Sequence, residues 1–220
     1  MKRIGIVLRV EVCDSVNILQ FHDILRTRLN NYEVNIIGII PKSSEFYLNN
    51  KDSKTDFKML EDSLKLCDGI ILPGGYDNFD FDYYITKYCY DNDIPILGIC
   101  LGMQAMAELL GGQIGTLPNQ THNITKQNYA IPVHTVTIDL NSKFYQIVKQ
   151  EVLFVNSRHS DYISKINPNY VVGLSDDGIV EVIEDHTKRF FVGVQWHAED
   201  MEDEPTKLLF NAFVDSIKTQ

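Results

Sequence analysis

A short apolar strand that runs directly into a helix-forming stretch, with a cysteine at the junction, constrains this chain more than any other feature. Residues 95–104 read PILGICLGMQ, so glycine stands two positions before and two positions after Cys100. A tight strand-to-helix turn strains its central residue and crowds the flanking positions, where Gly98 and Gly102 avoid a clash. This nucleophile-elbow pattern predicts that Cys100 is a nucleophile at the end of a buried strand.

The helix that starts at Leu101 is expected to take part in the reaction. Its free N–H groups and positive end point at the sulfur, which favours the thiolate that attacks. The Leu101 N–H can also stabilise an oxyanion. Upstream, an apolar run ends in LPGG at 72–75, and we predict the N–H of Gly75 as the second oxyanion donor. Taken singly, the cysteine could be inert core and the glycine pair a simple turn.

A histidine and an acid near the end of the chain complete a cysteine-based site. Residues 192–199 read VGVQWHAE, which places His197 and Glu199 just after a strand-like run. Strand ends are where α/β sheets display their sites. An imidazole there can accept the Cys100 proton and later protonate a leaving amine, while the carboxylate orients the imidazole. We therefore predict a catalytic triad of Cys100, His197 and Glu199.

Alternating apolar runs and amphipathic stretches predict an α/β fold with a mostly parallel central sheet and a small antiparallel flap. The expected strands are 4–8, 34–40, 69–72, 96–99, 133–140, 153–155, 170–175, 180–184 and 191–195. The expected helices are 18–29, 57–66, 81–90 and 204–215. Some of the later strands should extend the sheet and others should form the flap.

The composition excludes several classes of function. A formal net charge of -10 and a pI near 5.0 argue against a nucleic-acid surface, which needs clustered Lys and Arg. No apolar run approaches the length of a membrane span, and Glu11 interrupts the first one before a cleavable signal could form. We expect a cytoplasmic protein without a nucleic-acid or membrane partner. The cysteines lack the spacing of a zinc site or disulfide framework: Cys13, Cys67, Cys89 and Cys100.

Together and in this order, GICLGMQ around Cys100, LPGG at 72–75 and His-x-Glu at 197–199 resemble the class I glutamine amidotransferase superfamily. The resemblance spans nearly the whole chain. It implies one domain over 1–220, a flavodoxin-like three-layer sandwich, and a γ-glutamyl thioester resolved by water, with no cofactor or metal. VNSRH at 155–159 and DGIVEVIE at 177–184 are similar to the branch containing γ-glutamyl-γ-aminobutyrate hydrolase, which acts alone on γ-glutamyl amides.

The resemblance also implies a substrate-binding set. Arg158 is expected to pair with the α-carboxylate of the substrate, although it could equally be a solvated loop charge. Glu181 could hold the α-ammonium group or serve as a structural partner. The implied substrate-binding residues are Gln104, Asn156, Ser157, Arg158 and His159.

Three positions depart from the hydrolase branch. Leu101 replaces an Arg after the nucleophile, Ser160 replaces a second His, and Ala198 replaces a Pro between the His and Glu of the triad. These differences leave the leaving-group pocket undefined. The remaining histidines lie in no motif and are expected to be structural or surface residues: His122, His134 and His186.

Two enzymatic functions remain open. The leading hypothesis is a free-standing enzyme that hydrolyses a γ-glutamyl amide bond of a small molecule. The alternative is a glutaminase subunit that delivers ammonia to a separate synthetase partner, because GICLGMQ is typical of both. A non-enzymatic regulator would not need an intact triad. The sequence defines neither the group attached to the glutamyl unit nor the oligomeric state, and a homo-oligomer is compatible with it.

Overall fold

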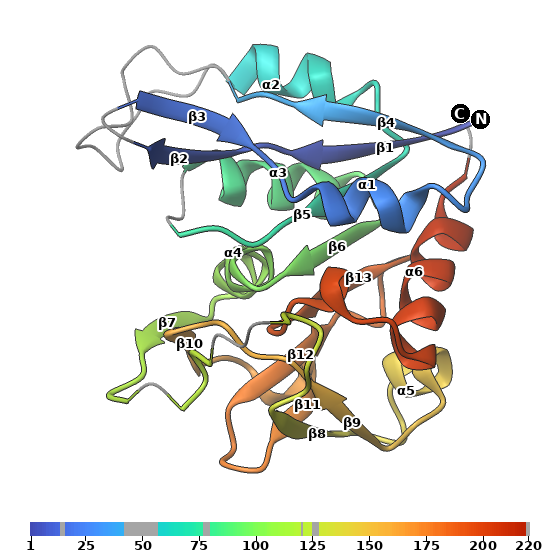
Figure 1. Ribbon diagram of the computed structural model, residues 1–220. Coiled ribbons are helices and arrows are strands. Elements are labelled where there is room, and N and C mark those ends of the chain that lie inside the picture. The colour runs from blue at the N-terminus through green and yellow to red at the C-terminus, as the bar shows by residue number, and fades with distance from the viewer. Residues whose placement is uncertain (14–15, 42–56, 77–79, 120, 125–127, 219–220) are drawn as a thin grey trace.

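The computed structural model describes residues 1–13, 16–41, 57–76, 80–119, 121–124 and 128–218. Its centre is a nine-stranded sheet with the order β4-β1-β5-β6-β13-β12-β11-β8-β9 (Figure 1). The first five strands in this order run parallel: β4 (Val34–Ile39), β1 (Lys2–Val7), β5 (Gly69–Leu72), β6 (Ile96–Ile99) and β13 (Phe191–Val194). An antiparallel extension follows: β12 (Val180–Glu184), β11 (Val171–Ser175), β8 (His134–Ile138) and β9 (Val152–Val155).

Helices cover both faces of the sheet, which confirms the predicted α/β sandwich. One buried cluster joins the sheet to α1 (Asp23–Leu29), α5 (Lys143–Val148) and α6 (Glu204–Ser216). The other joins it to α2 (Phe57–Leu64), α3 (Asp80–Asp91) and α4 (Leu101–Leu109). Among the described residues, no helix combines the length and apolar character that crossing a bilayer requires.

The parallel strands are apolar throughout because both of their faces are buried. In β5, Ile71 packs in the first cluster while Ile70 and Leu72 pack in the second. In β6, Leu97 and Ile96 divide in the same way. This alternation places side chains of a short continuous apolar run in two cores, so the run itself predicts a central strand.

The segment 18–29, predicted as one helix, is divided in the structure. Residues Val16–Gln20 form β3, which pairs antiparallel with β2 (Arg9–Cys13), and the helix begins only at Asp23. Ile18 and Leu19 are each 41% exposed, so the apolar helical face that the spacing indicated is not buried at its first turn. Residues 16–20 are a strand because they pair with β2, and local periodicity cannot reveal such a partner.

The antiparallel flap is also built from other residues than expected. All five late strands predicted from the sequence join the main sheet. Besides the β2–β3 pair, a second two-stranded sheet lies outside the main sheet and consists of β7 (Gln113–Thr116) and β10 (Asp161–Lys165). These two strands are short and contain polar residues, so no apolar pattern in the sequence predicts them.

Candidate active site

Three neighbouring parallel strands deliver the predicted catalytic segments to one edge of the sheet. The order β5-β6-β13 places the loop 73–75, Cys100 and His197 side by side, since each follows the carboxyl end of its strand. This is the edge where open α/β sheets bind ligands. Segments that lie far apart in sequence therefore meet because their strands are neighbours in the sheet.

Cys100 has the strained backbone of a nucleophile elbow. Its φ of 53° and ψ of -108° lie outside the regions that side-chain-bearing residues prefer, at a cost of about 1–3 kcal/mol. A Cβ on Gly102 would lie 1.9 Å from the Leu72 carbonyl oxygen, and one on Gly98 would lie 2.4 Å from the sulfur of Met106. The two glycines therefore allow β5, β6 and α4 to approach closely enough to hold this turn.

His197 is held from both its backbone and its ring. Its backbone N–H donates to Asn156 Oδ1 at 2.8 Å, and Asn156 Nδ2 donates to the His197 carbonyl oxygen at 2.9 Å. Its ring Nδ1 lies 2.7 Å from Glu199 Oε1. Because an ionised carboxylate only accepts, the Nδ1 hydrogen points at Glu199 and Nε2 is left to exchange a proton with another group.

The electrostatics of the triad favour a charged imidazole. Burial lowers the pKa of His197, but the charges of Glu199 and Cys100 more than offset it and raise that pKa to about 10. Burial works against ionisation of Glu199 as well, yet the neighbouring His197 charge holds the pKa of this carboxyl below its ordinary value. The neighbouring groups therefore stabilise the positive charge of His197 in a buried site.

Two other described cysteines are unsuited to attack. Burial raises the pKa of the Cys67 thiol to about 11, and it raises the pKa of the fully buried Cys89 still further. Neither lines the cavity described below. Only Cys100 among these combines a strand end, a helix N-terminus and a neighbouring base.

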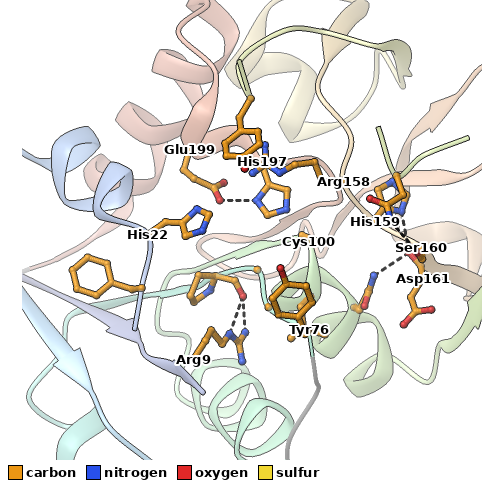
Figure 2. Close-up of a pocket in the computed structure, with 18 of the residues that line it drawn as sticks. Arg9, His22, Tyr76, Cys100, Arg158, His159, Ser160, Asp161, His197 and Glu199 are labelled. Atoms are coloured by element: carbon orange, nitrogen blue, oxygen red, sulfur yellow. Dashed lines mark hydrogen bonds and ion pairs between the residues drawn. The ribbon is translucent and has the colours of Figure 1, made fainter. Parts of the chain in front are cut away.

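A cavity of about 400 Å³ opens above Cys100, as Figure 2 shows. Glu199 and His197 lie on one side of the sulfur, and Arg9 lies on the other. Around the mouth, His22 and Tyr76 stand apart from a polar wall made by 158–161. A cavity of this size accepts a small molecule.

The structure places the predicted site residues in two groups. Those that line the cavity are Gly75, Cys100, Leu101, Gln104, Arg158, His159, His197 and Glu199. Asn156 and Ser157 lie behind it: Asn156 braces the His197 backbone, and the Ser157 hydroxyl donates to the His122 carbonyl oxygen at 2.7 Å. Their contacts indicate that they position neighbouring segments.

Gln104 and Arg158 both form hydrogen bonds with other residues of the protein as well as lining the cavity. Gln104 Nε2 donates to the Asp161 carbonyl oxygen at 3.1 Å. Arg158 Nη2 donates to Asp200 at 2.5 Å, and its guanidinium stacks 4.4 Å from the centre of the Tyr129 ring. Arg158 Nη1 is buried and has no partner among the described residues.

Sequence reasoning missed the side chain that braces the glycine loop. Arg9 Nε and Nη2 both donate to the Pro73 carbonyl oxygen, at 3.2 and 2.5 Å, and Nη1 pairs with the buried carboxylate of Asp82 at 2.5 Å. The loop that carries Gly75 is thereby fixed beside Leu101, whose side chain would lie 3.0 Å from a Cβ on Gly75. No local pattern marks Arg9, because its partners are more than sixty residues away.

Comparison with known families decides the relationship of this chain to other proteins. Residues 79–199, more than half of the chain, match the family described as peptidase C26, and the match contains Cys100, His197 and Glu199. The chain belongs to the peptidase C26 family. This assignment confirms the predicted class I glutamine amidotransferase-like membership, and with it a cysteine-dependent, hydrolase-type enzyme.

Individual relatives of this peptidase C26 chain differ in how much of their own length it spans. A glutamine amidotransferase-like protein of Rickettsia prowazekii is 27% identical, across 70% of this chain and 79% of that protein. A glutamine-hydrolysing GMP synthase of Neisseria meningitidis serogroup B is 33% identical across 72% of this chain, which spans only 30% of that synthase. The acivicin-bound glutaminase domain of Trypanosoma brucei CTPS has a TM-score of 0.71 at 19% identity, covering 100% of this chain and 96% of its own, which confirms the fold.

Glu199→Gln tests the acid of this peptidase C26 site. The change removes the charge that most raises the His197 pKa, so we expect kcat to fall by roughly 10²- to 10⁴-fold. The raised pKa of His197 gives stability that is fully present below its ordinary 6.5 and is lost as pH rises through about 10. The wild-type Tm should therefore fall more steeply than that of the variant between these pH values.

The neighbouring acid provides the control for this prediction. Asp200→Asn removes a carboxylate one residue away that pairs with Arg158 and does not contact His197 Nδ1. Its effect on kcat should be much smaller. If Asp200→Asn greatly lowered kcat while Glu199→Gln left kcat unchanged, the triad acid would be assigned to the wrong residue.

Proposed function

We propose that this chain hydrolyses a γ-glutamyl amide bond through a γ-glutamyl thioester on Cys100. The supporting observation is that Cys100, His197 and Glu199 line one cavity, and that Cys100 stands on an elbow with a strained φ of 53° at a helix N-terminus. Strain of this kind persists only where the surrounding structure enforces it, and it is typical of functional positions. The arrangement supplies a nucleophile, a base and an orienting acid.

The proposed reaction uses each group twice. The Cys100 thiolate attacks the γ-carbonyl carbon, and the negative charge moves to the carbonyl oxygen beside the N–H groups of Leu101 and Gly75. The C–N bond then breaks as protonated His197 gives its proton to the leaving amine. Water next attacks the thioester while His197 accepts a proton from it, and release of glutamate restores Cys100.

The brace on the glycine loop supports a free-standing hydrolase. A subunit that waits for a synthetase is expected to keep its oxyanion loop misplaced until the partner binds. Here the Arg9 guanidinium, itself only 6% exposed, holds the Pro73 carbonyl oxygen through two hydrogen bonds. The Gly75 N–H is thus positioned by groups that belong to the chain itself.

The polar wall of the cavity fits an amino-acid head group. Arg158 lines the cavity and brings a cation, which suits an α-carboxylate. The Asp161 carboxylate lines the same cavity and accepts a hydrogen bond from Thr116 at 2.8 Å, which leaves capacity for an α-ammonium group. We assign the glutamyl end of the substrate to this wall and the leaving amine to the side lined by His22 and Tyr76.

The second candidate function is that of a glutaminase supplying ammonia to a separate synthetase. It is favoured by the similarity to a glutamine-hydrolysing GMP synthase and to a CTP synthase of Chlamydia muridarum, which is 30% identical across 64% of this chain. The chain spans only 30% and 32% of those proteins. Under this alternative, the remaining part of the reaction would be carried by a partner.

Steady-state kinetics of the purified chain separate the two functions. The substrates are glutamine, γ-glutamyl-γ-aminobutyrate, γ-glutamyl-putrescine and a γ-glutamyl nucleotide conjugate. A free-standing hydrolase should turn over at least one of the substituted amides with a kcat of roughly 1 per second or more. Activity on glutamine alone, appearing only when a synthetase is added, would overturn the hydrolase in favour of the glutaminase.

Arg158→Met tests the proposed head-group contact. Losing a buried cation that pairs with the α-carboxylate should reduce transition-state binding, measured in kcat/KM, by about 2 to 5 kcal/mol. A substrate analogue without the α-carboxylate should be insensitive to the change. Equal losses on both substrates would mean that Arg158 acts through Asp200 and the surrounding structure instead of through the substrate.

A further inference from the structure

Four polar side chains that the catalytic triad does not use meet beside the active-site cavity. They are His122, His134 at the start of β8, His159 after β9, and Glu181 in β12. Glu181 is fully buried, and the side chains of His122 and His159 are 4% and 1% exposed. Each imidazole places one ring nitrogen 3.4 to 3.7 Å from Glu181 Oε1.

Hydrogen bonds on the far sides of two rings determine where their protons lie. His134 Nδ1 lies 3.1 Å from the Thr135 carbonyl oxygen, and His159 Nδ1 lies 2.9 Å from the Asp161 carbonyl oxygen. A carbonyl oxygen only accepts, so both Nδ1 atoms carry the hydrogen. In the neutral form of both rings, which a metal ion requires, the Nε2 atoms therefore turn lone pairs toward Glu181.

His122 has the same arrangement, except that its Nε2 is the donor and its Nδ1 faces Glu181. His122 Nε2 lies 3.1 and 3.2 Å from the two oxygens of the Asp177 carboxylate, so it is the donor. His122 Nδ1 then presents a lone pair, 3.4 Å from Glu181 Oε1. The Ser157 hydroxyl gives its hydrogen to the His122 carbonyl oxygen at 2.7 Å and so supplies none to Nδ1.

Lone pairs from three nitrogens and a carboxylate thus converge on a buried space. Among the described residues, nothing donates a hydrogen bond to either oxygen of Glu181 or to Nε2 of His134 and His159. Separations of 3.4 to 3.7 Å are too long for good hydrogen bonds. They are close to the spacing of about 3.3 Å between ligands that share one ion at 2.0–2.1 Å.

We propose that these residues bind a divalent transition-metal ion, which we assign as Zn²⁺. His122 Nδ1, His134 Nε2 and Glu181 form its core, with ligand atoms within 4.8 Å of one another. His159 Nε2 lies 3.6 Å from Glu181 Oε1 and stands beside this core. Imidazole and carboxylate ligands suit Zn²⁺, and three protein ligands leave a fourth position for a water molecule.

The far-side hydrogen bonds are those of a metal site. Metal-bound histidines usually donate their second ring N–H to a carboxylate or a backbone carbonyl, which orients the ring and makes the ligand more basic. Asp177, Thr135 and Asp161 provide these acceptors. No local motif indicates a metal here, because these residues lie in separate motifs or in none.

The ion would fasten the polar wall of the cavity to the sheet. His122 is followed by Asn123, and His159 lies between Arg158 and Ser160; all these neighbours line the cavity. Glu181 belongs to the antiparallel part of the sheet. The role of the ion is therefore to position the substrate-binding wall, and the ion takes no part in the bond-breaking steps.

Metal content of the tag-free protein tests the proposal. The protein is stripped with chelator, dialysed against micromolar Zn²⁺ and analysed by elemental mass spectrometry; Co²⁺ titration then reports coordination through its visible absorption. We expect one ion per chain, a visible absorption band from bound Co²⁺ and a rise in Tm on loading. Glu181→Gln and His134→Gln should abolish binding, and Asp177→Asn should weaken it by roughly 10- to 100-fold.

The control variant is His186→Gln, which removes an exposed histidine outside the cluster and should retain one ion. Circular dichroism establishes that each variant is folded. If the unaltered protein takes up no metal, or if folded Glu181→Gln binds as much as His186→Gln, the cluster shares protons instead of an ion and the proposal is wrong. The measurement on the unaltered protein does not depend on how the variants fold or on catalytic activity.

Discussion

Replacing Cys100 with alanine should lower kcat on γ-glutamyl amides by at least about 10⁴-fold, because no covalent intermediate can form. The Cβ and the backbone turn remain, so the fold should be intact. The measurements are steady-state kinetics, circular dichroism and mass spectrometry after reaction with a γ-glutamyl substrate. The wild-type enzyme should show a covalent adduct on Cys100, and the variant should show none.

Two further variants sharpen this prediction. Cys67→Ala removes a cysteine whose raised pKa makes it inert, and it should leave kcat nearly unchanged. Cys100→Gly removes the side chain that makes φ of 53° costly, so it should be more stable than Cys100→Ala by about 1 kcal/mol. Retained turnover in Cys100→Ala, or an adduct on another cysteine, would contradict the assignment of the nucleophile.

Replacing His197 with asparagine should reduce kcat by at least about 10⁴-fold with a much smaller change in KM, because the base acts in the transition state. The neutral side chain also removes the positive charge that the triad stabilises, and Cys100 should then react more slowly with iodoacetamide near neutral pH. Kinetics and the pH dependence of alkylation check both effects.

The matched control for this second prediction is His186→Asn, which removes an exposed histidine that does not line the active-site cavity. It should alter neither kcat nor the rate of alkylation. An effect of His197→Asn confined to KM would mean that this residue only binds substrate. Unchanged alkylation would mean that it does not influence the thiolate.

The local sequence predicted those elements that are recognisable from a short apolar pattern. The apolar runs at 69–72 and 96–99 are β5 and β6 with the expected bounds, because a strand buried on both faces needs a continuous apolar stretch. The elbow could also be predicted from the sequence. Gly98 and Gly102 stand where a Cβ atom would clash with neighbouring atoms, so the pattern of glycines around Cys100 marks the turn. Chemistry carried by a compact motif is therefore readable from the chain.

The sequence by itself determined the triad residues as candidates, the α/β class and the family to which the chain belongs. Only the tertiary structure decided that 16–20 pair as a strand, that Asn156 braces the His197 backbone, and that Arg9 holds the glycine loop. It also brought His122, His134 and Glu181 together. The physical reason is that these contacts join residues tens of positions apart, where strand order and packing set the neighbours and no local periodicity records them.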